Sequence, residues 1–121
     1  RQRQMCIRDR SGIRAVFLHG TPKPDPIPGQ PHFSEVPMPV NEVIRLRNGR
    51  MSGSDKKVIM GLAILGGEMA LTEVCLQDFK LAKDMDLVTS MHHSGLQLAG
   101  EQGYEMASKA GLLGEHINIV H

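Results

Sequence analysis

Histidines directly follow two short runs of strand-forming residues, where their type and position could support metal chemistry. Residues 87–91 end at His92 and His93, and residues 117–120 end at His121. The carboxyl ends of parallel strands meet at one rim, which is where α/β proteins carry their functional groups. Neutral imidazoles are good ligands for zinc and related divalent metals. We therefore predict that His92 and His121 bind a metal ion, and that the alternating His93 contacts substrate.

Two other polar residues come after predicted strands and belong to the same rim. His19 follows residues 12–18, and Glu68 follows residues 57–65 after two glycines. Polar residues at strand ends are usually hydrated, so we expect both side chains to be solvated at the rim. If His19 or Glu68 has a function instead, we expect it to be contact with substrate.

The elements that would hold these residues alternate along the chain between apolar runs of strand length and segments of helical spacing. This alternation favours parallel strands joined by right-handed crossovers, and the spacing of the strand ends favours part of a (β/α)8 TIM barrel. A complete barrel needs ~250 residues, so the chain would hold roughly half of one. An open flavodoxin-like sheet is the competing α/β architecture. We predict strands at 12–18, 57–65, 87–91 and 117–121, and helices at 40–47, 76–86 and 104–113.

All seven prolines of the chain lie between Thr21 and Pro39. Proline removes a backbone donor and disfavours helix at the residue before it, so this segment is predicted to be a long extended loop. Long loops in compact domains are usually functional or disordered. A partner-docking role is disfavoured because the segment lacks clustered basic or aromatic anchors.

Charge and composition exclude several kinds of partner. The formal net charge is +1, yet residues 1–10 carry four arginines against one aspartate, so the rest of the chain is slightly acidic. A nucleic-acid surface would need grouped basic residues, and the longest apolar run is far shorter than the ~20 residues that span a bilayer. Cys6 and Cys75 are too few for a disulfide framework. We predict no nucleic-acid partner, no membrane partner and a cytoplasmic location.

Residues 1–10 differ from the sequence that follows them. They are basic and have no helical or strand period, and Gln4-Met5-Cys6-Ile7-Arg8-Asp9 resembles the translated read-through of a sequencing adapter. We therefore predict that residues 1–10 are a non-native tail and that residues 11–121 specify the fold. A disordered basic terminus is the alternative, and it has the same consequence for the fold.

Several segments of residues 11–121, taken in order, carry a family resemblance. They are residues 12–17 (GIRAVF), 61–64 (GLAI), 90–92 (SMH), 111–114 (GLLG) and 120–121 (VH). Together they resemble the middle of the amidohydrolase superfamily, in the branch of cytosine deaminases and triazine chlorohydrolases. The resemblance implies a metal-dependent (β/α)8 barrel in which these segments supply strands three to six.

This resemblance also implies a chemistry. His92 would match the metal ligand on strand five of the family, and His121 would match the ligand on strand six. The family binds one zinc or iron ion, which activates water to attack a C–N or C–halogen carbon of a small cyclic or heteroaromatic substrate. The parent protein is accordingly expected to be a hydrolase that acts on a small molecule and forms a homo-oligomer.

Three features of the family are missing from the sequence. There is no His-x-His for strand one and no strand-eight aspartate, and Gly95 stands where many members carry a proton-shuttling glutamate. We therefore assign no catalytic residue, and we expect the 121-residue chain to be inactive and to bind metal weakly. Two alternatives stay open: a complete small α/β binding or regulatory domain, and a non-catalytic relative of the barrel family.

Overall fold

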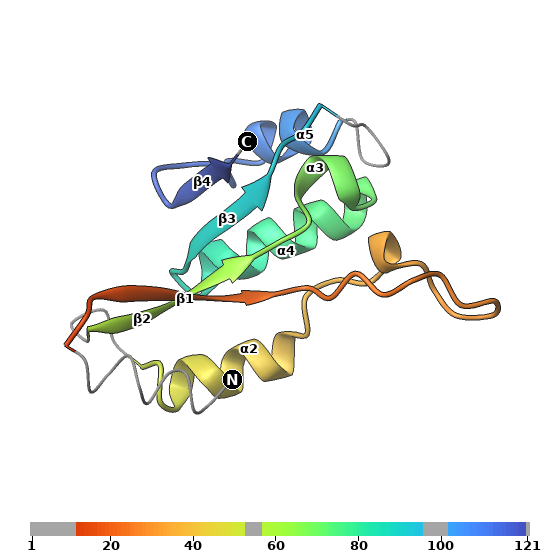
Figure 1. The fold of residues 1–121 in the computed structure, drawn as a ribbon. Helices are drawn as coiled ribbons and strands as arrows, with labels where there is room; N and C mark the ends of the chain where they lie inside the picture. The colour runs from red at the N-terminus through yellow and green to blue at the C-terminus, as the bar shows by residue number, and fades with distance from the viewer. Residues whose placement is uncertain (1–11, 53–56, 96–101, 121) are drawn as a thin grey trace.

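The computed structural model describes residues 12–52, 57–95 and 102–120. Within these ranges strands and helices alternate, as the sequence predicts, and Figure 1 shows the resulting α/β arrangement. The predicted tail at residues 1–10 lies outside the described ranges. The strands are β1 (Ala15–Gly20), β2 (Val58–Ala63), β3 (Val88–His92) and β4 (Ile117–Val120). The helices are α2 (Val40–Asn48), α3 (Gly66–Met69), α4 (Thr72–Asp84) and α5 (Gly103–Lys109), with a short 3-10 helix, η1 (Phe33–Glu35).

The four strands are parallel and lie in the order in which they occur in the chain, β1-β2-β3-β4. Phe17 of β1 lies beside Met60 of β2, and Leu62 of β2 lies beside Thr89 of β3. An open doubly wound sheet reverses its strand order at a switch point, and the described sheet has no such reversal. The four parallel strands with helices between them confirm the predicted parallel α/β class.

One face of the sheet packs against the helices and forms the hydrophobic core. Leu62 and Met91 on this face are at most 3% exposed, and they share the core with Val43 of α2, Phe79 of α4 and Ala107 of α5. Because side chains alternate along a strand, α2, α4 and α5 all cover the same face. Each fully buried side chain of this size contributes roughly 1.5–3 kcal/mol, so this face holds the sheet and helices together.

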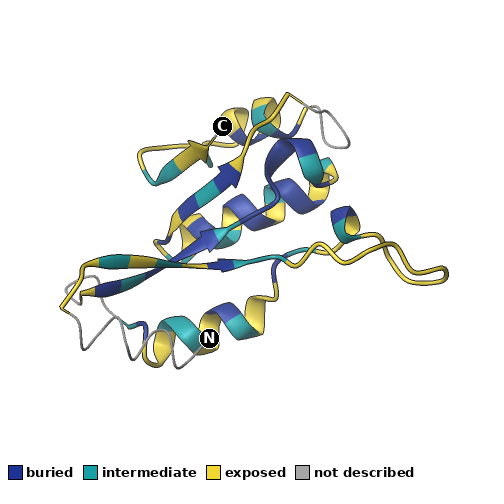
Figure 2. Cartoon of the chain, in the orientation of Figure 1, coloured by how far each residue is buried: buried dark blue, intermediate teal, exposed yellow. Residues whose placement is uncertain are grey.

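The other face of the sheet is apolar, and no described helix covers it. Valine and leucine side chains on this face are 38–43% exposed, and Figure 2 shows exposed positions along β1 and β4 in yellow. The register places Leu18, Gly61 and Val88 in one row across three strands. This surface, which we call the open face, consists of Val16, Leu18, Ile59, Val88 and Val120.

Several element boundaries differ from the sequence prediction. β1 continues to Gly20, so His19 lies inside the strand rather than after it. α4 begins at Thr72, earlier than predicted, because buried residues extend its apolar face toward its amino end. α5 ends at Lys109, before the predicted end, and the prediction lacks α3, since its two glycines disfavour helix. None of the helices in the described ranges is long and apolar enough to cross a lipid bilayer.

The proline-rich segment is an extended loop, as predicted, and it contains η1. Its far end is fixed to α4, because the Met38 amide donates to Asp78 Oδ1 at 2.8 Å. Asp78 is 1% exposed, and its other oxygen, Oδ2, has no hydrogen-bond partner within the described residues. Burial raises the pKa of Asp78 to about 6, against the opposing effect of the Met38 amide. The loop is therefore fixed to the core through a buried carboxyl group.

Candidate functional site

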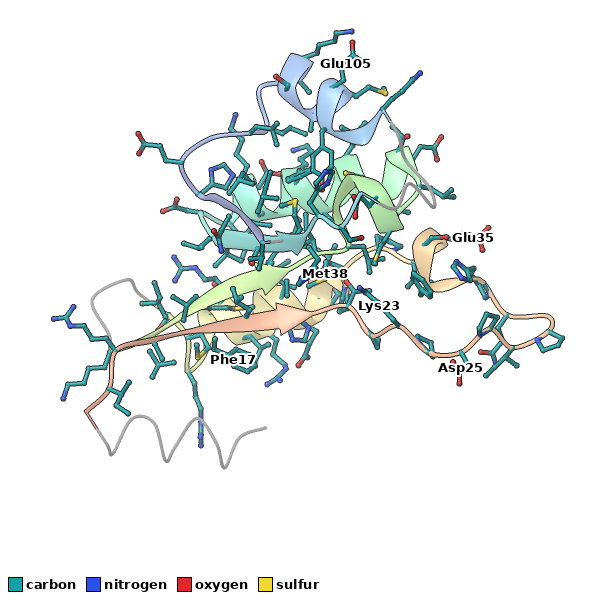
Figure 3. All side chains as sticks on the ribbon, turned by 45° about the horizontal axis from the view of Figure 1, so that its top comes forward. Phe17, Lys23, Asp25, Glu35, Met38 and Glu105 are labelled. Carbon is teal, nitrogen blue, oxygen red and sulfur yellow. The ribbon has the colours of Figure 1, made fainter. Side chains whose placement is uncertain are left out.

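A cleft of about 240 Å³ opens at the carboxyl ends of the strands. Ser90 and His92 of β3 line it together with Val120 of β4, and Thr21 and Lys23 reach it from the start of the proline-rich loop. Figure 3 shows Lys23 beside the end of β1. Parallel α/β proteins place their functional groups at this end of the sheet, so the cleft is the candidate site of this chain.

His92 occupies the last position of β3 and is exposed. Its register partner on β4 is Val120, and alternation puts His92 on the same side of the sheet as Ser90 and Val88. The imidazole therefore lies on the side of the open face and lines the mouth of the cleft rather than the helix-covered core. The second predicted ligand, His121, lies outside the described residues.

Glu68 is buried, which corrects the expectation of a solvated residue at the rim: it is 2% exposed. Its carboxylate accepts hydrogen bonds from the Ser94 amide at 2.9 Å, the Gly95 amide at 2.7 Å and the Ser94 hydroxyl at 3.1 Å. It also pairs with Nδ1 of His93 at 3.0 Å. These donors replace the water that the carboxylate loses on burial, so the core tolerates it.

Hydrogen bonds keep Glu68 ionised. The amide of Ser94 is the largest cause that lowers the pKa of Glu68 below its usual value, and together with the other donors it outweighs the opposing effect of burial. An ionised carboxylate can only accept, so Nδ1 of His93 carries the proton in this pair. The structure thus brings together two residues that the sequence assigned separately to substrate contact. A carboxylate that orients an imidazole is an arrangement used both at metal sites and in acid–base catalysis.

Glycines around α3 allow this close packing. A Cβ on Gly67 would lie 2.7 Å from the Tyr104 ring, and one on Gly103 would lie 3.0 Å from Cys75 Sγ. The Tyr104 ring meets the His93 ring edge-on, with centroids 5.9 Å apart. Burial raises the pKa of the Tyr104 hydroxyl, and the nearby backbone amide of Gly67 has a smaller effect in the opposite direction. The hydroxyl is buried and has no hydrogen-bond partner of good geometry within the described residues. The sequence analysis did not predict that Tyr104 lies beside His93. The sequence signal for close packing around α3 is the pair of glycines before Glu68.

His19 does not reach the cleft. It lies beside Leu62 of β2, on the helix-covered face, and it is 9% exposed. The expectation of a solvated rim residue is therefore wrong for His19 as well. The reason is that β1 continues past it to Gly20, so alternation turns the imidazole toward the core.

The described residues do not complete a metal site by themselves. Within residues 12–52, 57–95 and 102–120, no group of three or more histidine, cysteine, aspartate or glutamate side chains is arranged to hold a metal ion. A zinc site needs three or four protein ligands. The chain also matches no family model, no curated protein and no solved structure. The amidohydrolase resemblance is therefore carried by the sequence segments alone.

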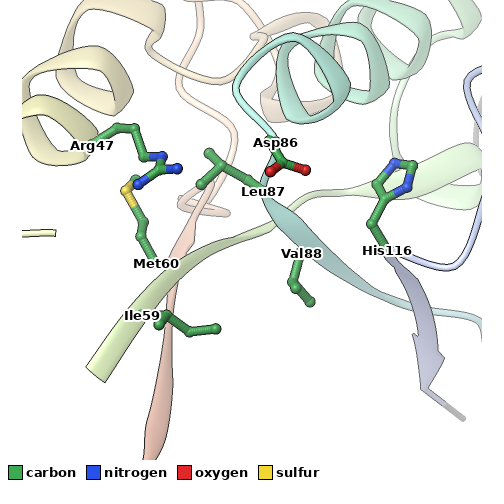
Figure 4. A pocket seen from close by; sticks show the side chains of 7 residues that line it. All are labelled: Arg47, Ile59, Met60, Asp86, Leu87, Val88 and His116. Carbon is green, nitrogen blue, oxygen red and sulfur yellow. The ribbon is translucent and has the colours of Figure 1, made fainter. Parts of the chain in front are cut away.

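A second cavity, of about 200 Å³, lies at the opposite, amino-terminal ends of the strands (Figure 4). Arg47, Asp86 and His116 line it together with apolar residues of β2 and β3. Arg47 donates to the carbonyl of Met51 at 3.3 Å and to that of Met85 at 3.4 Å, so it ties the end of α2 to the turn before β3. Polar residues at this end of a parallel sheet usually serve stability, and we assign this cavity no part in the site.

Glu68→Gln is expected to loosen the backbone of Ser94 and Gly95. A neutral amide accepts at only one oxygen and turns a donor toward one of the two backbone amides, so at least one of these hydrogen bonds is lost. Hydrogen exchange at the two amides should become at least roughly tenfold faster. Glu73→Gln, at an exposed position of α4, is the matched control and should leave exchange unchanged. Equal protection in both variants would contradict this role of Glu68.

Proposed function

We propose that this chain forms four successive βα units of a (β/α)8 barrel in a metal-dependent hydrolase. The observation that carries the proposal is the position of His92, an imidazole at the carboxyl end of a parallel strand, on a side of the sheet that the described helices leave open. In a closed barrel this side is the interior, and groups at its carboxyl end form the active site. The order β1-β2-β3-β4 is also the order of successive strands in such a barrel.

The substrate class and the metal come from the sequence resemblance. We propose hydrolysis of a C–N bond, or of a C–halogen bond, in a small cyclic or heteroaromatic molecule, with one zinc or iron ion. His92 and His121 would supply two of the ligands. Because the described residues hold no complete ligand set, the remaining ligands must come from outside the described ranges.

Other residues of the chain have roles that do not depend on the metal. Ser90 and Lys23 line the cleft and would offer a hydroxyl group and a cation to a polar substrate. Glu68 holds His93 and the two backbone amides that follow it, which fixes the path of the chain after β3. Gly95 has no side chain that could shuttle a proton, so the acid must lie elsewhere in the parent protein.

Metal binding by the intact parent protein tests the proposal. We expect elemental analysis to find one zinc or iron ion per molecule. His92→Ala should weaken zinc binding by more than roughly 100-fold, since loss of a group that merely orients a ligand already costs 10–100-fold. His116→Ala is the matched control, because His116 lines the cavity at the opposite end of the strands, and it should keep the full metal content.

Equal metal content in the two variants would show that His92 is not a ligand. The coding sequence beyond both ends gives a second test, in which we expect an upstream His-x-His and a downstream strand-end aspartate. A natural stop after residue 121, with no bound metal, would favour a complete small α/β binding domain. Barrel sequence without the His-x-His would favour a non-catalytic relative. The 121-residue chain itself should turn over aminopyrimidines or triazines negligibly.

A further inference from the structure

The returning limb of the proline-rich loop, from Ser34 to Met38, is attached to α4 at two points. The Ser34 carbonyl accepts from the amide of Leu71, at the start of α4, at 3.0 Å. About two turns further along the helix, the Met38 amide donates to Asp78 Oδ1 at 2.8 Å. In Figure 1 the loop extends away from the sheet and then returns to the helices. The closed position of this limb therefore depends on a buried carboxyl group.

Asp78 has too few hydrogen-bond donors for a buried carboxylate. Among the described residues only the Met38 amide donates to it, and its Oδ2 is buried without a partner. Glu68, the other buried carboxylate, accepts from the Ser94 amide and hydroxyl and from the Gly95 amide. Burying a charge is costly unless hydrogen bonds or an opposite charge compensate for the lost water. The core therefore accommodates Asp78 as a neutral acid and disfavours its ionised form.

Neighbouring ionisable groups do not compensate for a charge on Asp78. Those on the surrounding elements are His32 and Glu35 of η1, Glu68 of α3, Cys75 of α4 and Tyr104 of α5. The face of β3 that packs on α4 carries no ionisable side chain. Burial, and after it the charge of Asp78, raise the pKa of Cys75 to about 12, so the thiol is neutral. Burial likewise raises the pKa of Tyr104, and Glu35 bonds within η1.

We propose that Asp78 is a pH-dependent latch for the proline-rich loop: the neutral acid holds the limb from Ser34 to Met38 on α4, and ionisation releases the limb. Release gives both carboxylate oxygens access to water, while α4 keeps its own backbone hydrogen bonds. Burial raises the pKa of Asp78 in the closed form from 3.8 to about 6. Release therefore becomes more favourable as the pH rises from the lower value through the upper one, by up to on the order of 100-fold.

The latch is connected to the cleft through the side chain of Met38. Its Sδ accepts from Thr21 Oγ1 at 2.7 Å, and both Thr21 and Lys23 line the cleft. When the limb leaves α4, Thr21 loses this contact and the start of the loop is less constrained, so the cleft is more open at neutral pH than in acid. Only this consequence for substrate access rests on the proposed function, since the latch itself involves neither metal nor substrate.

Hydrogen exchange of the Met38 amide tests the latch. Its protection factor, which corrects for the intrinsic pH dependence of exchange, should fall roughly tenfold from pH 5 to pH 7.5. Asp78→Asn should show no such fall, because an amide does not ionise. Asp84→Asn, at an exposed position of the same helix, is the matched control and should behave as the wild type. At the higher pH, the Met38 amide should be at least roughly tenfold less protected than the Ile64 amide, which donates within the sheet at 3.0 Å.

A fall in the wild type and in Asp84→Asn that is absent from Asp78→Asn supports the latch. Constant protection of Met38 in the wild type overturns it, and so does an equal fall in Asp78→Asn or the loss of the fall in Asp84→Asn. If the Met38 and Ile64 amides are equally protected at both pH values, the limb opens only when the whole protein unfolds, and local release is wrong. These measurements need no added metal or substrate, so failure of the latch and failure of the proposed hydrolase are distinguishable.

Discussion

The Asp78→Asn variant is expected to be more stable than the wild-type protein at pH 7, by up to about 3 kcal/mol. Burial raises the pKa of Asp78 from 3.8 to about 6, so ionising this carboxyl group works against folding at neutral pH. Asparagine has the same shape and stays neutral. Its carbonyl oxygen can still accept the hydrogen bond from the Met38 amide, which fixes the proline-rich loop to α4.

The pH dependence gives the sharper readout of Asp78. Because its folded-state pKa is raised, the folded protein holds the proton more tightly than the unfolded chain between pH 3.8 and about 6. The stabilising contribution of this group is therefore fully present below the lower value and is lost as the pH rises through the upper one. Asp78→Asn should remove this contribution to the pH dependence of stability. Urea unfolding should show little difference in stability between wild type and Asp78→Asn near pH 3.8, and the largest difference at neutral pH.

An exposed carboxylate on the same helix provides the control for Asp78. Asp84 pairs with Lys80 at the surface of α4, at 2.6 Å, and surface ion pairs contribute little to stability. Asp84→Asn should therefore leave both the stability and its pH slope nearly unchanged. A pH slope that is the same in Asp78→Asn as in the wild type, or a variant that is less stable than the wild type at pH 7, would contradict the buried environment described for Asp78.

The Gly61→Ala variant is expected to lose about 3 kcal/mol of unfolding free energy, the upper end of the usual cost of overpacking. A Cβ at this position would lie 2.6 Å from the Val88 carbonyl oxygen and 2.7 Å from Cδ2 of Leu18. The leucine can rotate away, but the oxygen belongs to the backbone of β3. Relief therefore requires β2 and β3 to separate, which weakens the parallel pairing at the centre of the sheet.

Gly20→Ala is the matched control for this prediction, because Gly20 lies in the neighbouring strand of the same sheet. A Cβ there would meet the Ala63 Cβ at 3.6 Å, an ordinary contact. The substitution should be neutral or slightly stabilising, since alanine restricts the unfolded chain more than glycine does. Chemical unfolding of both variants measures the difference. Equal midpoints for Gly61→Ala and Gly20→Ala would refute the steric argument.

The alternation of strands and helices could be predicted because each element carries its own periodicity. The continuous apolar run that became β2 is typical of a strand covered by helices, and the helical spacing that follows it predicted α4. Short elements were less visible. η1 depends on a capping box between His32 and Glu35, and α3 depends on the left-handed backbone of Gly66, at φ +71°. Neither signal is a repeating pattern of apolar residues, so the hydrophobic periodicity of the sequence predicted no helix in either segment.

Burial of the two carboxylates could not be predicted, because their partners are remote in the sequence. Glu68 bonds to Ser94, 26 residues away, and Asp78 bonds to Met38, 40 residues away. Acidic side chains are rarely buried unless they are paired, so an isolated one in a periodic sequence is normally expected to face solvent. Only the folded chain supplies the donors that make these positions acceptable. For the candidate site, the sequence predicted the strand end that carries His92, while the pairing of His93 with Glu68 became visible only with α3 in place.

The order of the strands also bears on how the protein is made. Each described strand pairs only with its neighbours in the chain, so the sheet has no pairing that must wait for a distant segment. As the polypeptide leaves the ribosome, each new βα unit meets an edge that has already formed. The proline-rich loop lengthens the path from β1 to β2, but doubling a loop costs only about 0.6 kcal/mol in closure entropy. The chain is therefore suited to fold one unit at a time during its own synthesis.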